Sequence, residues 1–232
     1  MRMRKKKHGA ERLFECSDFL VEKPEISDPS RKVFLEIGAG KGGFACGMTE
    51  LYPDVDYYAM EKVTDCVVLA AEKAKASGRK NLKFINDTAD NLTRLFPCGS
   101  VDAMFLNFSD PWSKKGYAKR RLTHRRYLAV YFNLLKDGGV LTFKTDNVGL
   151  FDFSLEEIEA MGLSCEVVTR DLHSSEWMKG NVVTEYEANF SLQGIKINML
   201  RVVKPCGFAP EIPEELRSDA KRGREYTSNL EE

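Results

Sequence analysis

Short apolar runs alternate with amphipathic segments along most of this 232-residue chain. Apolar runs bounded by glycine, proline or polar residues predict strands at 32–37, 55–60, 82–85, 101–108, 140–143, 165–170, 184–191 and 197–203. Apolar residues at helical spacing predict helices at 44–51, 63–77, 91–96, 120–135 and 154–161. Strands and helices that alternate in this way imply an α/β fold, with a mostly parallel sheet and helices on both faces.

The two ends of the chain depart from this pattern. Residues 1–31 are polar and basic, and we expect an arm packed onto the domain, with a solvated tail as the alternative. Residues 32–204 then form the α/β domain. Residues 205–232 contain three prolines and few apolar residues, which predicts a mobile tail.

Charge is balanced over the whole chain but unevenly distributed. The 35 basic and 35 acidic side chains give a formal net charge of zero, which by itself favours no polyanionic partner. Residues 114–126, however, hold seven Lys and Arg and no acid, whereas 211–232 hold seven acids and four bases. A neutral total therefore hides a dense basic run that could contact a polyanion.

Cysteine and histidine spacing indicates the compartment and argues against a metal. The six cysteines form no CxxC pair and the three histidines do not cluster with them, so we expect free thiols and no bound metal. No uncharged apolar run approaches the ~18–20 residues of a membrane span, and no signal-peptide core follows the basic start. We predict a cytoplasmic protein with reduced thiols.

A glycine-rich turn follows the first predicted strand. Gly38, Gly40 and Gly43 match the GxGxxG pattern of dinucleotide enzymes, although glycines in such a turn can also serve packing. Glu36 lies two residues before the first glycine, and with Gly42 the segment also fits E-x-G-x-G-x-G. A carboxylate at Glu36 suits a ligand with a cationic amino acid moiety better than a pyrophosphate.

Acids also end the second and third predicted strands. Glu61 can accept hydrogen bonds from both hydroxyls of a ribose, and Asp87 lies within reach of an adenine amino group. A single acid at a strand end is more often a turn former than a ligand. Three acids in a row beside a glycine turn favour S-adenosylmethionine as the cofactor, with NAD as the alternative.

The fourth predicted strand ends in Asn107-Phe108-Ser109-Asp110-Pro111-Trp112, directly before the basic run. An acid and an aromatic beside dense positive charge suit chemistry on a nucleobase. Trp112 could stack on a base or anchor packing. The basic residues could contact phosphates or form a solvated helix face.

Here the chain resembles a known family. The segment N-F-S-D-P-W-x-K-K, followed by K-R-R-L at 119–122, resembles the tRNA (guanine-N7-)-methyltransferase family. K-T-D at 144–146 and T-E-Y-E at 184–187, with Phe190, are similar to its later motifs, and the likeness runs from about 32 to 200. Ser113 stands where the family usually has proline, which leaves the backbone freer at that point.

The resemblance implies a class I, Rossmann-like methyltransferase fold with a seven-stranded sheet, and methylation of guanine N7 at position 46 of tRNA. Asp110 would be the catalytic acid. Together with the glycine turn, the resemblance implies cofactor contacts from Glu36, Gly38, Gly40, Gly42, Glu61, Asp87 and Asp110. It implies substrate contacts from Lys114, Asp146, Thr184, Glu185, Tyr186 and Glu187.

Several alternatives stay open. Asp146 could cap the helix that follows it, and Thr184, Tyr186 and Glu187 could be ordinary strand residues. The substrate could be another RNA or a small molecule. The chain could also be a non-catalytic RNA-binding protein with a vestigial cofactor site, although the intact acids and glycines argue against that.

Overall fold

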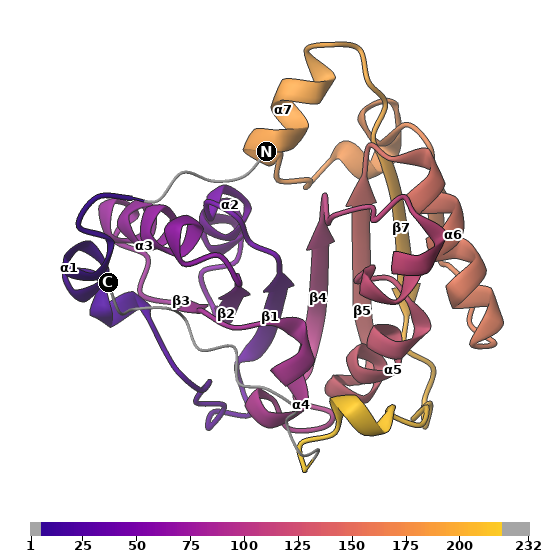
Figure 1. Ribbon diagram of the computed structural model, residues 1–232, viewed down its shortest axis with the longest axis horizontal. Helices are drawn as coiled ribbons and strands as arrows, with labels where there is room; N and C mark the ends of the chain where they lie inside the picture. Colours follow the sequence, from indigo (N-terminus) through magenta and orange to yellow (C-terminus); the bar gives the residue numbers. More distant parts are fainter. Residues whose placement is uncertain (1–5, 220–232) are drawn as a thin grey trace.

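The computed structural model describes residues 6–219, so the basic start at 1–5 and the end of the predicted tail at 220–232 lie outside the described residues. Its sheet has seven strands in the order β3-β2-β1-β4-β5-β7-β6 (Figure 1). They are β1 (Lys32–Ile37), β2 (Val55–Met60), β3 (Leu82–Ile85), β4 (Val101–Asn107), β5 (Leu135–Thr145), β6 (Val167–Thr169) and β7 (Asn198–Val203). Only β7 runs antiparallel to its neighbours, which confirms the predicted mostly parallel α/β fold.

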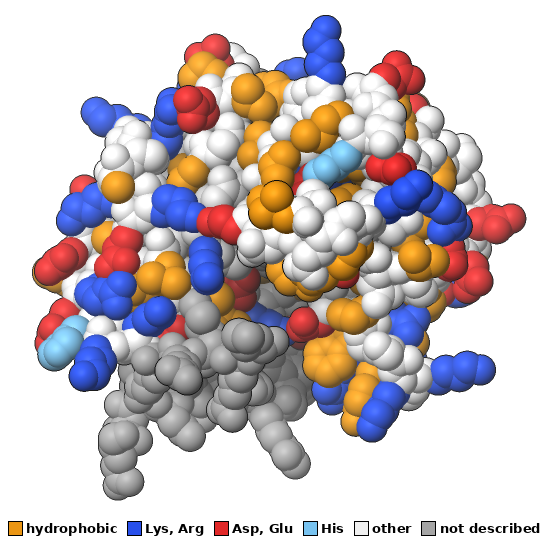
Figure 2. Space-filling model, turned by 90° about the horizontal axis from the view of Figure 1, so that it is seen from above, with side chains coloured by type: hydrophobic (Ala, Val, Ile, Leu, Met, Phe, Trp, Pro, Cys, Tyr) orange, Lys and Arg blue, Asp and Glu red, His pale blue; other side chains and the backbone are white. Residues whose placement is uncertain are grey.

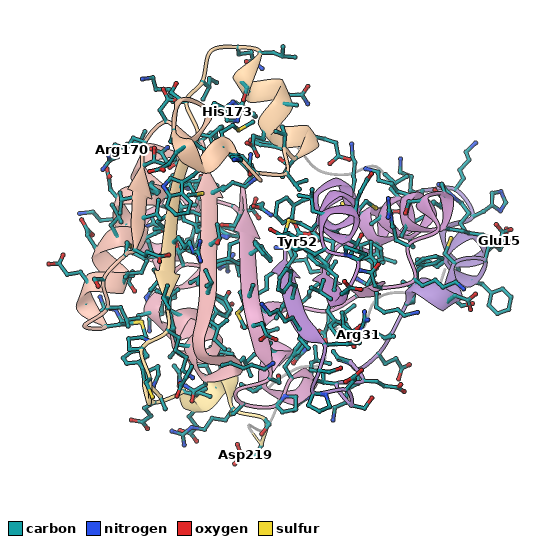
Figure 3. All side chains as sticks on the ribbon, turned by 180° about the vertical axis from the view of Figure 1, so that it is seen from behind. Glu15, Arg31, Tyr52, Arg170, His173 and Asp219 are labelled. Atoms are coloured by element: carbon teal, nitrogen blue, oxygen red, sulfur yellow. The ribbon has the colours of Figure 1, made fainter. Side chains whose placement is uncertain are left out.

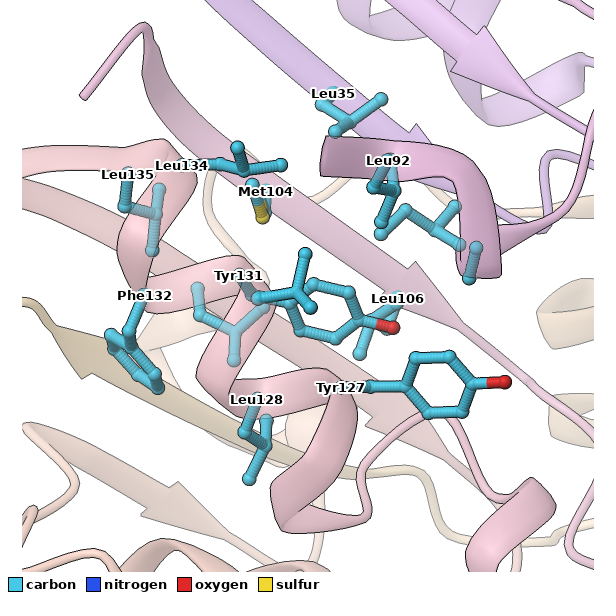
Figure 4. Packing of buried hydrophobic residues seen from close by; sticks show 14 of the residues in the cluster. Leu35, Leu92, Met104, Leu106, Tyr127, Leu128, Tyr131, Phe132, Leu134 and Leu135 are labelled. Atoms are coloured by element: carbon cyan, nitrogen blue, oxygen red, sulfur yellow. The ribbon is translucent and has the colours of Figure 1, made fainter. Parts of the chain in front are cut away.

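Helices cover both faces of the sheet. They are α1 (Gly9–Phe14), α2 (Gly43–Leu51), α3 (Thr64–Ser77), α4 (Leu92–Leu95), α5 (Arg125–Leu134), α6 (Val148–Ala160) and α7 (Glu185–Ser191). Side chains alternate between faces along each strand, so Leu35 joins one apolar cluster and Tyr57 joins the other. Figure 4 shows the first cluster, in which Leu92 of α4 and Tyr131 of α5 pack against Met104 of β4.

The N-terminal arm adds to the edge of the sheet. Helix α1 packs against α3, and Arg12 of α1 donates two hydrogen bonds to the Glu72 carboxylate, at 2.6 and 2.7 Å. Beyond α1, Leu20 forms a parallel bridge with Phe84 of β3, and the Val21 amide donates to the Phe84 carbonyl at 3.0 Å. The arm therefore covers a strand edge that would otherwise be open.

One predicted element is of the wrong type, and several predicted boundaries differ; α6 begins at Val148 rather than 154, and β5 begins at Leu135 rather than 140. The segment 184–191 is not a strand but helix α7, because Thr184 caps it in a capping box with Glu187. Seven strands remain once it is removed from the predicted set. The helix predicted at 120–135 begins only at Arg125, since the His124 side chain caps it by accepting from the Arg126 amide at 3.1 Å.

The predicted mobile tail is also wrong for its described part. Leu216 is 2% exposed and belongs to the main apolar cluster, and Phe208 packs edge-on against Phe132 of α5. The Thr93 hydroxyl of α4 donates to the Leu216 carbonyl at 2.7 Å. Residues 205–219 therefore form a strap across α4 and α5, at the end of the sheet opposite α7 (Figure 1).

Candidate functional site

The carboxyl ends of β1, β2, β3 and β4 meet at one edge of the sheet, which is where ligands bind in folds of this kind. Gly38 and Gly40 follow β1 with φ of 82° and 55°, conformations that side-chain-bearing residues rarely adopt. An added Cβ would meet nothing within 4 Å at either position, so open space lies beside this turn. Gly42 differs, because a Cβ there would lie 2.9 Å from the Ala70 Cβ; its glycine allows α2 to pack on α3.

Glu61 joins the glycine turn to the end of β2. Its buried carboxylate accepts from the Gly40 amide and the Val63 amide, each at 2.9 Å and each on a different oxygen. A carboxylate offers about four lone-pair sites, so each oxygen keeps one for a further donor. That capacity fits the two ribose hydroxyls expected here.

Glu36 is more deeply buried than a surface ligand contact would be. It is 2% exposed, and its oxygens accept from the Asn107 amide at 3.0 Å and the Tyr57 hydroxyl at 3.4 Å. Burial raises the pKa of the Glu36 carboxyl to about 7, against these hydrogen bonds and the nearby charge of Lys144. A cationic group beside Glu36 would therefore favour its ionised form.

Asp87 lies at the end of β3. Its Oδ1 accepts from the Thr88 amide at 2.7 Å and from the Asn91 side chain at 2.5 Å, which fixes the carboxylate at the edge. The neighbouring Asn86 donates to the Glu61 carbonyl at 2.9 Å and so holds the ends of β2 and β3 together.

The segment after β4 carries backbone strain. Phe108 and Trp112 have φ of 52° and 42°, two of the three positive values among non-glycine residues in 6–219. Between them, the Ser109 hydroxyl is buried without a hydrogen-bond partner from the described part of the chain. Such an unpaired group at a strained turn is typical of a site that a ligand completes. Asp110 therefore lies between the unpaired Ser109 hydroxyl and the strained backbone of Trp112.

Asp110 itself is exposed. The side chain is 70% accessible, and its nearest cation is Lys62 Nζ at 3.9 Å, in the loop that follows Glu61. The structure thus brings Asp110 next to the predicted cofactor loop, with its carboxylate open to a ligand.

Aromatic rings gather next to Asp110. Tyr186 of α7 lies 5.1 Å from the Phe108 ring and stacks on Phe190 at 4.4 Å between centroids, while 48% of Tyr186 stays exposed. Burial and the charges of Asp146 and Asp110 raise the pKa of the Tyr186 hydroxyl. Asn107 and Phe108 were not predicted as site residues, although both lie in the N-F-S-D segment.

The other predicted substrate residues are placed less uniformly. Asp146 is half-buried and does not cap α6, because the Asn147 side chain accepts from the Leu150 amide at 2.8 Å. Thr184 and Glu187 are buried, whereas Glu185 is exposed and paired with Lys73. Thr184 caps α7, and Tyr186 and Glu187 lie within it, so the alternative that these three are strand residues is wrong.

The basic run divides into two groups. Arg121 donates to the carbonyls of Pro111 and Trp112 at 3.0 and 3.1 Å, Arg125 pairs with Glu157, and Arg126 pairs with Asp90. These three arginines hold the fold together. The exposed members that remain, with no ion pair to a residue in 6–219, are Lys114, Lys115, Lys119 and Arg120.

Trp112 is committed to a local cluster. The Arg120 guanidinium lies over the Trp112 ring at 5.0 Å and over the Tyr117 ring at 4.8 Å. Figure 2 views the molecule from above this edge, where hydrophobic side chains gather beside a histidine and basic side chains lie around them. The cluster of Trp112, Tyr117 and Arg120 can stack on a ring, as can the half-exposed ring of Tyr186.

The described residues include no cluster of three or more His, Cys, Asp or Glu that could hold a metal ion. No helix within 6–219 is long and apolar enough to cross a membrane.

A family model described as "Putative methyltransferase" matches residues 30–200. Among solved structures, the 16S rRNA methyltransferase KamB aligns with a TM-score of 0.59 at 14% identity, over 80% of this chain and 98% of that chain. An antibiotic-related methyltransferase aligns with a TM-score of 0.55 at 16% identity, over 87% and 96% of the two chains. Geranyl diphosphate C-methyltransferase from Streptomyces coelicolor A3(2) gives 0.51 at 13% identity, over 84% and 78%. At these identities the structural likeness shows a shared fold.

Proposed function

The chain belongs to the methyltransferase family whose model spans residues 30–200, and we propose that it methylates N7 of guanine at position 46 of tRNA. The methyl donor is S-adenosylmethionine, as the sequence predicts. When bound, this cofactor supplies an electrophilic methyl group on a sulfonium. The proposal concerns the acceptor of this methyl group, which is N7 of a guanine in tRNA.

We assign the cofactor to the sheet edge described above. Glu61 would accept from the ribose hydroxyls with its two remaining lone pairs, and Asp87 would accept from the adenine amino group. Glu36 would offer a negative charge to the amino acid moiety. The Gly38 and Gly40 backbone would approach the ligand closely, since open space lies beside both residues. Gly42 supports them by letting α2 pack on α3.

The observation that carries the proposal is the packing of Tyr186 on Phe108, with ring centroids 5.1 Å apart, two residues before Asp110 in the segment after β4. Guanine N7 has a lone pair and no proton, so its methylation needs no general base. The product base is cationic, and a fixed carboxylate at Asp110 would stabilise the positive charge that develops, or orient the ring through its N–H edge. We assign catalysis to Asp110 on that ground.

The surroundings of Asp110 support an RNA substrate. A base taken out of its stack needs an aromatic surface, and Tyr186 next to Phe108 offers one at the required place. Lys114, Lys115, Lys119 and Arg120 form an exposed positive patch without a local acid partner in the described chain, suited to phosphates. We further assign Asp146 and the start of α7, Thr184–Glu187, to substrate binding, with Glu185 and Tyr186 exposed and with Thr184 and Glu187 buried in the capping box that holds them.

The test incubates the protein with labelled S-adenosylmethionine and an unmodified tRNA transcript, and then analyses nucleosides by mass spectrometry. We expect 7-methylguanosine at position 46, and a transcript carrying adenosine at that position should gain no label there. The fold is shared with a 16S rRNA methyltransferase and with a geranyl diphosphate methyltransferase, so rRNA fragments belong in the same assay. Label in rRNA alone, or in no RNA, would contradict the proposal.

A further inference from the structure

Lys144 lies near the end of β5 and carries a buried charge. It contacts neither the proposed methyl donor site nor Asp110 through any hydrogen bond within residues 6–219. Its side chain is 2% exposed. The ammonium donates to Asn181 Oδ1 at 2.8 Å, to the Val182 carbonyl at 3.1 Å and to Glu187 Oε2 at 2.8 Å. A lysine ammonium has three donors, and all three go to one stretch of chain. We call residues 181–191, which include α7, the α7 segment.

Glu187 is the centre of that stretch. It is fully buried, and its other oxygen accepts from Asn181 Nδ2 at 2.8 Å and lies 2.7 Å from His173 Nε2. Figure 3 shows His173 beside α7 above the sheet. The Thr184 hydroxyl completes the capping box by accepting from the Glu187 amide at 2.9 Å. The start of α7 is therefore set by contacts that converge on the pair of Lys144 and Glu187.

The other side of the α7 segment rests on α2, the helix that follows the glycine turn. A Cβ at Gly47 would lie 2.5 Å from Val182 Cγ1, and one at Gly43 would collide with the Glu185 carboxylate. These two glycines, four residues apart, give α2 a flat face for the segment. Lys144 reaches the same helix, with its ammonium 4.8 Å from the Phe44 ring centroid.

Holding this segment fixes the aromatic surface next to Asp110. Tyr186 lies between Glu185 and Glu187, so the contacts of its neighbours determine where its ring points. That ring lies 5.1 Å from the ring of Phe108, which is two residues before Asp110. The Lys144 ammonium therefore connects β5 with both the α7 segment and α2.

We infer that Lys144 is a positioning residue for the nucleic-acid substrate: it clasps the α7 segment to β5 so that Tyr186 presents its ring beside Asp110. The inference rests on the proposed function, in that the occupant of this surface is a guanine of RNA. A purely structural ion pair is the competing explanation, because a buried salt bridge is weak support for a special role.

The experiment compares Lys144→Met, Glu187→Gln and the double variant Lys144→Met/Glu187→Leu with Lys136→Met as the matched control. Lys136 is also an ion-paired lysine of β5, bonded to Asp102 at 2.7 Å at the opposite end of the strand. Each protein is measured by amide hydrogen exchange over 181–191, by thermal unfolding, and by kcat/KM for the tRNA transcript.

Both single variants should speed exchange in 181–191 and lower kcat/KM for tRNA by roughly a hundredfold, as expected for a misplaced contact surface. Lys136→Met should change neither readout. The double variant carries no unpaired buried charge, so it should regain thermal stability without regaining kcat/KM.

Recovery of kcat/KM together with stability in the double variant would overturn the inference, as would unchanged exchange over 181–191 in Lys144→Met. The two proposals fail separately. A wild-type protein that makes no 7-methylguanosine contradicts the proposed function, whereas the exchange rates still decide whether Lys144 clasps the segment.

Discussion

At the residue scale, Glu36 gives the site a titration near neutral pH. Burial raises the pKa of its carboxyl to about 7, so the folded protein holds a proton that the unfolded chain releases near pH 4.5. A raised pKa contributes stability that is complete below the unfolded value and is lost as the pH rises through the folded value. From about pH 4.5 to 7, Glu36 should therefore make folding less favourable by up to roughly 3 kcal/mol.

Urea unfolding of the wild-type protein and of Glu36→Gln between pH 4.5 and 8 measures this contribution. Glutamine cannot ionise, so the free energy of unfolding of the wild type should fall relative to the variant as the pH rises. Subtracting the two curves removes the titration of all other groups. A constant difference across the range would show that Glu36 ionises like an exposed acid.

The charge of Asp110 can also be tested by a single substitution. Asp110→Asn keeps the size of the side chain and removes its charge, so it should abolish turnover, with a loss of at least roughly a hundredfold in kcat. Because 70% of the side chain is exposed and its pairing with Lys62 is long, thermal stability and tRNA affinity should change little. Single-turnover methylation and filter binding provide the two measurements. Turnover close to wild type would remove Asp110 from its assigned role.

The acids at strand ends could be predicted because each follows an apolar run, and parallel strands bring their carboxyl ends to one edge. The contribution of Asn107 and Phe108 could not. The Asn107 bond to Glu36 depends on pairing between β1 and β4, and the Phe108 ring reaches Tyr186 through a backbone φ of 52° that no sequence pattern announces.

At the element scale, the basic segment before and within α5 contains two kinds of basic side chain: some form ion pairs within the fold, and others are exposed without one among residues 6–219. Arg125 forms a bidentate pair with Glu157, whose side chain is only 7% exposed, while Lys119 is exposed and has no ion pair among residues 6–219. Arg125→Ala leaves a mostly buried carboxylate without its main partner and should lower the melting temperature. Its effect on the salt dependence of tRNA binding should be small.

Lys119→Ala should show the opposite pattern. The melting temperature should stay constant, whereas the slope of log K for tRNA against log salt should become shallower by roughly 0.7–0.9, the loss of one phosphate contact. Differential scanning fluorimetry and binding titrations at several salt concentrations measure both quantities. Equal salt slopes for wild type and Lys119→Ala would exclude Lys119 from the interface.

The sequence could not separate these two groups, because the acids that pair with Arg125 and Arg126 lie 32 and 36 residues away along the chain. By contrast, α7 did carry a local signal. Thr184 and Glu187 match the S/T-x-x-E/Q capping box, which predicts a helix start. In a helix of seven residues, the capping residues indicate the structure better than the spacing of the apolar residues does.

At the scale of the whole molecule, the mostly parallel sheet followed from the sequence because its apolar runs alternate with amphipathic segments. The strap at 205–219 did not, since its few apolar residues are separated by prolines and charges. Phe208, Ile212 and Leu216 recur every four residues, and all three pack against the main apolar cluster. Three anchors at that spacing suffice to hold an otherwise polar segment onto α4 and α5.

Leu216 tests whether this strap belongs to the cooperative fold. Its side chain is 2% exposed, so Leu216→Ala should leave a cavity between the strap and α4 and cost about 2–5 kcal/mol of unfolding free energy. Glu214 lies two residues away with an exposed side chain, and Glu214→Ala should change stability by less than about 0.5 kcal/mol. Urea unfolding followed by far-UV circular dichroism and by the emission of the two tryptophans gives both values. If Leu216→Ala unfolds with the same midpoint and slope as Glu214→Ala, the strap is peripheral. If instead the midpoint falls while both probes still coincide, residues 205–219 unfold together with the sheet that carries the site.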